Sequence, residues 1–233
     1  MTLARHVEME WLDALDADDA RARRSREDLR RINVAMGSLS IALAALDRTV
    51  GRSPPRSMLE LGAGDGTLMA RIARRRAACW PGVRVTLLDR QRVVSADALE
   101  RIRAAGWQAR AVTHDALEWL QHPPAQRFDV IFANLFVHHF NGEALTRLLR
   151  GIAAHGRAFA CCEPRRDRTS LAASRLVAFI GAGAVARHDA VASVRAGFRE
   201  RELSALWPDA PAWSLREYAA APFTHCLVAT RAA

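Results

Sequence analysis

The stretch Met58-Leu-Glu-Leu-Gly-Ala-Gly-Asp-Gly-Thr67 decides the fold of this 233-residue chain. Its first residues place one carboxylate, Glu60, among apolar side chains and predict a strand over residues 57–61. Three glycines follow at every second position, and a helical pattern begins at Thr67. Glycine lets the backbone approach a ligand and adopt positive φ, and the N-terminus of a helix offers unpaired N–H groups. The stretch therefore predicts a strand–turn–helix unit that cradles a ligand.

Beyond this unit, strand-like and helical segments alternate. The expected strands are residues 57–61, 83–88, 108–113, 128–133 and 157–162, and the expected helices are residues 67–78, 93–105, 116–121 and 143–154. Such alternation builds βαβ units with right-handed crossovers, which place a parallel sheet between two layers of helices. The last strand-like runs, residues 214–220 and 224–230, are joined by a connection short enough for an antiparallel pair. We predict an α/β fold with a doubly wound, Rossmann-like sheet of seven strands, mostly parallel, with an antiparallel last strand.

Gly51-Arg-Ser-Pro-Pro55 interrupts the chain before this sheet and marks a domain boundary. Residues 1–50 predict an N-terminal helical cap, with helices expected within residues 5–31 and over residues 28–47, where apolar side chains recur every three or four positions. Residues 51–233 form the predicted main domain.

Within the main domain, residues 164–212 break the alternation of strands and helices. Helices are expected there at residues 170–180 and 199–206, and together with the cap they predict a lid over the site. The side chains expected to line this lid are Trp11, Met36, Phe179, Phe198 and Trp207.

Composition excludes several classes of protein. Hydrophobic residues make up 50% and charged residues 25% of the chain, which is typical of a globular protein and not of a disordered one. The longest apolar run, residues 39–46, is far too short for a membrane span, and the N-terminus lacks the apolar core of a signal peptide. We therefore expect a cytoplasmic protein without a membrane span. Four cysteines without C-x-x-C spacing are expected to be buried thiols in a reducing compartment.

The net charge of +9 comes from 34 basic residues that are all arginine and are scattered along the chain. A scattered distribution does not predict a dedicated nucleic-acid surface, so nucleic acid is an unlikely partner.

Four motifs in order resemble the class I S-adenosylmethionine-dependent methyltransferases. Glu60 precedes three glycines in a G-x-G-x-G pattern, whereas a dinucleotide fingerprint would place its third glycine at position 67. Asp89 ends the second expected strand, Asp115 follows the third, and Asn134 follows the fourth. The resemblance covers about residues 57–163 and, more loosely, the last two strands.

The resemblance implies S-adenosylmethionine as cofactor, with Asp89 on the ribose hydroxyls and Asp115 on the adenine amino group. The implied cofactor-binding residues are Glu60, Gly62, Ala63, Gly64, Gly66, Asp89, Arg90, Asp115, Ala116 and Asn134. Ligands of open α/β sheets bind at the carboxyl ends of strands, which is where these residues fall. Taken singly, Asp89 and Asp115 also suit helix N-caps.

The run Asn134-Leu-Phe-Val-His-His-Phe140 is similar to the His-His or His-Asp stretch of small-molecule methyltransferases. The missing proline after Asn134 speaks against methylation of nucleic-acid amines. In the plant-type O-methyltransferases the first residue of the pair deprotonates the substrate hydroxyl, which implies His138 as general base, with His139 as the second catalytic candidate. An unperturbed histidine pKa near 6.5 suits that task. In other relatives the pair packs under the cofactor or caps the next helix.

The sequence thus predicts methyl transfer from S-adenosylmethionine to a small-molecule acceptor, namely a hydroxyl of an aromatic, quinone- or polyketide-type metabolite of secondary metabolism. An RNA or protein methyltransferase, motivated by the net charge of +9, and an inactive binding module remain the alternatives. No His/Cys/Asp cluster has metal-ligand spacing, so no metal is expected. Whether the chain forms a homodimer stays open.

Overall fold

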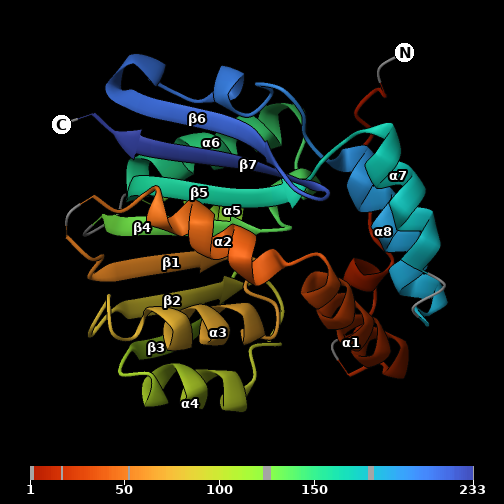
Figure 1. The fold of residues 1–233 in the computed structure, drawn as a ribbon, viewed down its shortest axis with the longest axis horizontal. Coiled ribbons are helices and arrows are strands. Elements are labelled where there is room, and N and C mark those ends of the chain that lie inside the picture. Colours follow the sequence, from red (N-terminus) through yellow and green to blue (C-terminus); the bar gives the residue numbers. More distant parts are fainter. Residues whose placement is uncertain (1–2, 17, 52, 123–126, 178–180, 233) are drawn as a thin grey trace.

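A computed structural model describes residues 3–16, 18–51, 53–122, 127–177 and 181–232. Seven strands form one sheet in the order β3-β2-β1-β4-β5-β7-β6 (Figure 1). They are β1 (Ser57–Leu61), β2 (Arg84–Asp89), β3 (Gln108–Thr113), β4 (Phe128–Asn134), β5 (Gly156–Pro164), β6 (Trp213–Ala220) and β7 (Thr224–Arg231). The last strand, β7, pairs antiparallel with β5 and β6, and the other pairs are parallel. The predicted fold class is confirmed.

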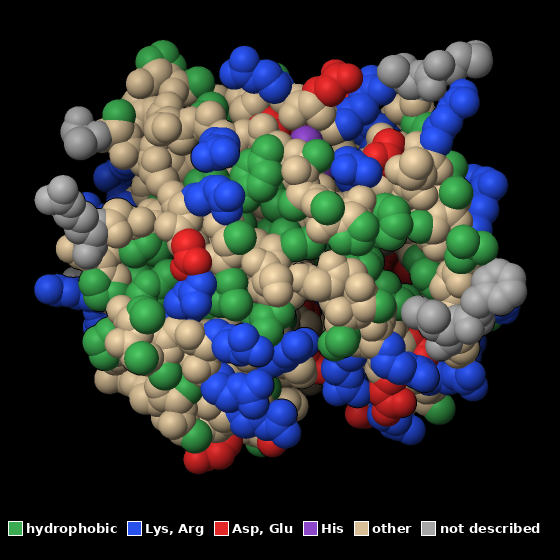
Figure 2. Space-filling model, in the orientation of Figure 1, with side chains coloured by type: hydrophobic (Ala, Val, Ile, Leu, Met, Phe, Trp, Pro, Cys, Tyr) green, Lys and Arg blue, Asp and Glu red, His purple; other side chains and the backbone are tan. Residues whose placement is uncertain are grey.

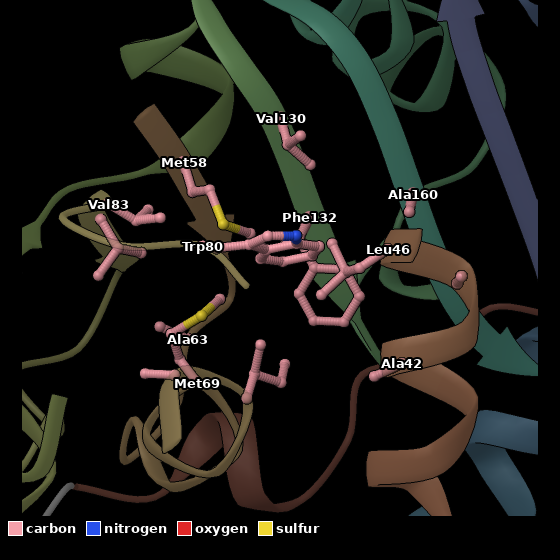
Figure 3. Packing of buried hydrophobic residues seen from close by; sticks show 14 of the residues in the cluster. Ala42, Leu46, Met58, Ala63, Met69, Trp80, Val83, Val130, Phe132 and Ala160 are labelled. Atoms are coloured by element: carbon pink, nitrogen blue, oxygen red, sulfur yellow. The ribbon is translucent and has the colours of Figure 1, made fainter. Parts of the chain in front are cut away.

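Helices cover both faces of this sheet (Figure 1). One face carries α2 (Ser38–Asp47), α3 (Thr67–Arg76) and α4 (Ala96–Ala104), and the other carries α5 (Ala116–Trp119) and α6 (Gly142–His155). Because successive side chains of a strand point to opposite faces, two separate apolar cores form. In the first core Met58, Val130 and Phe132 of the strands meet Leu46 of α2 (Figure 3). Burial of each large side chain stabilises the fold by roughly 1.5–3 kcal/mol.

The N-terminal segment differs from its prediction. Residues 3–10 form no helix or strand, and the first α-helix, α1 (Ala20–Ala35), begins only after a 3-10 turn at Leu12–Ala14. Tertiary contacts explain the difference, since Arg5 and His6 bond to the backbone of residues 195 and 196, and such contacts override local helix propensity.

The expected helix over residues 28–47 is also broken, at Gly37. This glycine has a φ of +68°, which an α-helix does not allow. After the break, α2 packs Leu39 and Leu46 into the core of the sheet. Part of the predicted cap is therefore packed against the sheet of the predicted main domain.

The predicted lid over residues 164–212 differs from the structure as well. It contains α7 (Arg168–Arg175) and α8 (Ala184–Ala196), and residues 199–206 form turns with a 3-10 turn at Ser204–Leu206 instead of a helix. The sequence did not indicate α8 because its buried face consists largely of small side chains such as Ala186 and Ala192, which leave no period of large apolar residues.

The residues expected to line the lid lie elsewhere. Phe198 and Trp207 are buried in the second core, Met36 ends α1, and Trp11 stacks on His188 of α8. Phe179 lies outside the described residues.

Two further observations concern membranes and thiols. Among the described residues no single helix has the length and apolar character to cross a membrane, and α1 with α2 meets that test only as a pair bent by 66°. Cys161, Cys162 and Cys226 are buried, as expected, but Cys79 is exposed.

Candidate functional site

A cleft of about 750 Å³ lies at the carboxyl ends of the central strands. A cleft of this size holds a small-molecule ligand. The predicted residues that line it are Glu60, Gly62, Ala63, Gly64, Asp89, Arg90, Asp115, Ala116, Asn134 and His139. Gly66 and His138, which were predicted with them, do not line it. Ten of the twelve predicted residues therefore line one cleft, and the other two do not.

The glycine-rich turn after β1 adopts the backbone that the motif predicts. Gly62, Gly64 and Gly66 all have positive φ values, of +66°, +55° and +78°. A Cβ on Gly62 would lie 2.3 Å from the ring of Phe136, so only glycine fits there. Gly66 is the N-cap of α3 and packs near Ala98, which explains why it lies behind the cleft wall.

Asp89 links this turn to β2. Its Oδ2 accepts the N–H of Gly64 at 2.8 Å, and its Oδ1 accepts the N–H of Gln91 at 2.9 Å. Burial raises the pKa of Asp89, although these two hydrogen bonds oppose that effect. Each carboxylate oxygen keeps an acceptor position beyond these bonds, so Asp89 both braces the loop and can accept from a ligand hydroxyl.

Asp115 has the second role that its position suggested. It is the N-cap of α5, and its Oδ1 accepts the N–H of Glu118 at 3.0 Å. Its side chain is exposed at the cleft wall, next to buried Ala116. A contact of Asp115 with adenine stays a prediction.

The cleft is acidic around β1. Glu60 is almost fully buried, and its Oε2 has no hydrogen-bond partner among the described residues. Burial, together with the charges of Asp89 and Asp65, raises the pKa of Glu60 well above its ordinary value. An orphaned buried carboxyl beside two further carboxylates favours a cationic ligand. These residues therefore fit S-adenosylmethionine, which has a sulfonium and an ammonium group.

His138 is closed off from the cleft. Its ring is buried between two carboxylates, with Nδ1 at 2.7 Å from Glu163 Oε2 and Nε2 at 3.3 Å from Glu10 Oε1. Burial by itself lowers the pKa of His138, but the hydrogen bonds and charges of Glu10 and Glu163 outweigh it and raise this pKa to about 9. A histidine that is protonated at neutral pH cannot accept a proton. The geometry therefore speaks against the expectation that His138 is the general base.

His139 is the member of the pair that faces the cleft. Its ring centroid lies 4.2 Å from that of His138, and its Nδ1 lies 3.6 Å from Asp13 Oδ2. Burial and the positive charge of His138 lower the pKa of His139, against the opposing charges of Glu10 and Asp13. The two adjacent imidazoles thus have pKa values shifted in opposite directions, upward for the buried His138 and downward for the cleft-lining His139.

Glu163 holds the turn with the two histidines and was not singled out from the sequence. It has no exposed surface, and it accepts the backbone N–H groups of Phe136, Val137 and His138 at 3.0–3.2 Å in addition to the ring of His138. A glutamate that directly follows Cys161-Cys162 in a buried strand was the available signal, because a buried charge needs partners.

The second missed feature is the N-terminal strap, defined as residues 3–16. Arg5 donates to the carbonyl oxygens of His138 and Phe140, and the N–H groups of Trp11 and Leu12 donate to Asp189. Cleft-lining residues of the strap are Val7, Glu8, Met9, Glu10, Leu12 and Asp13. No local signal marks this segment, because its partners lie far away in the sequence.

Glu10, His138 and His139 form the group of described residues whose donor atoms, all within 4.8 Å of one another, could suit a metal ion. Sequence spacing could not show this group. Hydrogen bonds from both ring nitrogens of His138 to carboxylates require a proton on each nitrogen, which leaves no lone pair for a metal. The absence of a metal stays a prediction.

Comparisons with known proteins agree with this geometry. Residues 59–158 match a family model described as a methyltransferase domain. No curated protein matches the sequence.

Solved structures share the fold at low sequence identity. An O-methyltransferase family protein from Burkholderia thailandensis is 16% identical with a TM-score of 0.62, and the match covers 92% of this chain and 61% of that one. PhzM, a pyocyanin biosynthetic protein, is 20% identical with a TM-score of 0.59, over 94% and 62% of the two chains. The magnesium protoporphyrin IX methyltransferase of Synechocystis PCC 6803, solved with bound SAM, is 13% identical with a TM-score of 0.53, over 92% and 85%.

The chain thus spans about three fifths of the length of the first of these relatives. The likeness to these structures concerns the fold. The family match adds the sequence pattern of residues 59–158, which includes the glycine-rich turn, Asp89 and Asp115. Residues 59–158 thus carry the pattern of a methyltransferase domain, and the strand order and the acidic cleft at the carboxyl ends of the strands agree with the resemblance to the class I S-adenosylmethionine-dependent methyltransferases.

Proposed function

We propose that the protein transfers the methyl group of S-adenosylmethionine to a hydroxyl group of a small, largely apolar molecule, with His139 as general base. An aromatic, quinone- or polyketide-type metabolite of secondary metabolism fits this description. The observation that carries the proposal is the position of His139 at the wall of the cleft that is also lined by the predicted cofactor residues, and the lowered pKa of His139 supports it. Similar structures named for pyocyanin biosynthesis and for magnesium protoporphyrin IX support a small-molecule acceptor.

In this proposal, Asp89 accepts from the ribose hydroxyls, and Asp115 with Ala116 meets the adenine ring. Glu60 and the turn at Gly62 lie at the remaining, acidic part of the cleft and face the cationic groups. When bound, S-adenosylmethionine supplies an electrophilic methyl group on a positively charged sulfur.

The acceptor side of the cleft is supported by its apolar lining. Residues of the strap, of α1 and of the turn after β4 contribute Val7, Met9, Leu12, Leu29, Val34 and Phe140. Met9 and Val34 are 72% and 59% exposed, so large apolar side chains surround the mouth. Exposed apolar surface at a cleft is typical of a site that binds an apolar ligand.

His139 accepts the hydroxyl proton in this proposal while the acceptor oxygen attacks the methyl carbon. General-base help of this kind is worth about 10²–10⁴ in rate. The buried positive charge of His138 keeps His139 unprotonated at neutral pH, so the two histidines have different roles. The general base in this proposal is therefore His139, whereas the sequence implied His138.

An RNA or protein acceptor is less well supported. Figure 2 shows the arginines of one face in several separate groups with apolar and other side chains between them, not as one continuous basic surface. Arg26, Arg30 and Arg71 do line the cleft, but Arg30 is paired with Asp65.

Two measurements test the proposal. Isothermal titration with S-adenosylhomocysteine is expected to give a micromolar Kd, and the absence of binding at high micromolar concentrations contradicts cofactor binding. Transfer of labelled methyl from S-adenosylmethionine is then assayed on hydroxylated phenols, quinones and phenazines, with total RNA and a protein extract alongside. We expect label on a hydroxyl of a small molecule. Labelled RNA or protein favours an RNA or protein methyltransferase. Cofactor binding without transfer to any acceptor favours an inactive binding module.

A further inference from the structure

The N-terminal strap crosses the site on polar contacts, to which the stacking of Trp11 on His188 and of Arg5 on the Phe198 ring is added. None of residues 3–16 is buried. At one end Arg166 holds the carbonyl oxygen of Leu3 at 3.0 Å, and at the other Arg90 pairs with Asp13 at 3.2 Å. Between them, Asp189 of α8 accepts the N–H groups of Trp11 and Leu12 at 2.8 and 3.0 Å. The strap is therefore fastened at several points along the cleft without an apolar core of its own.

Glu10 is the strap residue that reaches deepest. Its side chain is only 12% exposed, and its Oε1 contacts both His138 Nε2, at 3.3 Å, and the hydroxyl of Ser193 on α8. Burial by itself raises the pKa of Glu10, but the hydrogen bond and charge of His138 outweigh it and lower this pKa to about 2. A full negative charge thus enters the site from a segment that is not part of the sheet.

We propose that Glu10 is a positioning residue for the reaction, and that the histidine pair is complete only while the strap lies closed over the cleft. This inference rests on the proposed function, in which His139 is the base. Glu163 fixes His138 from the sheet side through Nδ1, and Glu10 fixes it from the strap side through Nε2. The ring of His138, fixed in this way, keeps its positive charge next to the ring of His139.

Among the described residues, few charged side chains face the pair formed by His138 and His139. Glu10, Glu163 and His139 face His138, while His138 and Asp13 lie nearest to His139. Opening of the strap removes Glu10 and Asp13 together, along with the apolar wall of Val7, Met9 and Leu12. Ligand entry and completion of the site are thereby coupled to one movement.

The test compares Glu10→Gln with Asp16→Asn in the full chain. The first keeps the size of the side chain and an acceptor oxygen but removes the charge, whereas the second removes a strap charge whose exposed side chain has no hydrogen bond or ion pair among the described residues. The titration midpoint of His138 is followed by NMR of the ring nitrogens. We expect it near pH 9 in the wild type and in Asp16→Asn, and at least one pH unit lower in Glu10→Gln.

A third variant, Asp189→Ala, unfastens the strap without touching either histidine. If closure brings Glu10 into place, the His138 midpoint falls in this variant as it does in Glu10→Gln. A midpoint that stays at the wild-type value in Glu10→Gln or in a folded Asp189→Ala overturns the inference.

Turnover supplies the second readout. Glu10→Gln is expected to lower kcat at least tenfold while the Kd of S-adenosylhomocysteine stays within about threefold of the wild type. Equal kcat values for Glu10→Gln and Asp16→Asn overturn a positioning role. The NMR measurement needs no acceptor, so a wild type without turnover but with a shifted His138 midpoint in Glu10→Gln contradicts the proposed function and leaves the strap contact established.

Discussion

Glu163 Oε2 lies 2.7 Å from Nδ1 of His138, and the carboxylate of Glu163 also accepts three backbone N–H groups of the turn that contains this histidine. The end of β5 thereby determines the shape of the turn that follows β4. The 3-10 turn at Val137–His139 points one histidine at the sheet and the next at the cleft. Two adjacent residues of the same type thus have opposite environments.

Replacing Glu163 with glutamine is expected to destabilise the protein by about 2 kcal/mol, since the amide leaves buried donors without a charged acceptor. For a chain of this length that corresponds to a fall in Tm of about 4–8 °C. Thermal unfolding followed by circular dichroism measures it. Exposed Glu143→Gln is the control, and an equal Tm for the two variants contradicts the role of Glu163.

Stability is expected to fall in alkaline solution because of His138. Its folded-state pKa of about 9 lies above the unfolded value near 6.5, so its contribution is complete below about pH 6.5 and is lost as the pH rises through about 9. The contribution is on the order of 3 kcal/mol. Urea unfolding at pH 6.5 and pH 10 measures the difference, which His138→Gln is expected to reduce. If the wild type has the same free energy of unfolding at pH 6.5 and at pH 10, His138 is not protonated in the folded protein.

His139→Ala is expected to lower kcat by about 10²–10⁴ through loss of the general base, with little change in cofactor affinity. Because burial and His138 lower the pKa of His139, the acid limb of kcat/KM in the wild type is expected below pH 6.5. Added imidazole is expected to restore part of the activity of His139→Ala. His122→Ala, an exposed histidine outside the cleft, serves as control. Unchanged kcat in His139→Ala rejects the assignment.

Local sequence was enough for the strands and for the turn and carboxylates that line the cleft at the ends of β1 and β2. The turn at Gly62 and the carboxylate of Asp89 belong to a strand–turn–helix pattern whose geometry is set within a few residues. The acceptor side could not be predicted in this way. Glu10 and His138 are 128 residues apart in the chain, and only the folded sheet and α8 bring them together. Which histidine faces the cleft depends on a turn held by Glu163, so the adjacent pair looked equivalent in the sequence.

Gly62→Ala is expected to abolish measurable cofactor binding. Its Cβ would lie 2.3 Å from the Phe136 ring at a φ of +66°, so the turn and the residue beside the histidines must both shift. Gly64→Ala is the matched control, because it has a similar positive φ of +55° but meets nothing within 4 Å. The control carries a backbone strain of about 1–2 kcal/mol. Titration with S-adenosylhomocysteine compares the two, and equal Kd values contradict the steric argument.

Glu60→Gln is expected to stabilise the ligand-free protein and to weaken cofactor binding. Burial, with help from Asp89 and Asp65, raises the pKa of Glu60, so its ionised form is disfavoured in the folded state. A raised carboxyl pKa destabilises the fold above the unfolded value near 4.3, and an uncharged amide removes that cost. A bound cation favours the ionised form of Glu60, which the amide cannot adopt, so S-adenosylmethionine is expected to lose at least tenfold in affinity. Urea unfolding at pH 8 and isothermal titration give the two quantities. If Glu60→Gln is less stable than the wild type and binds S-adenosylmethionine equally well, the charge of Glu60 has no role in cofactor binding.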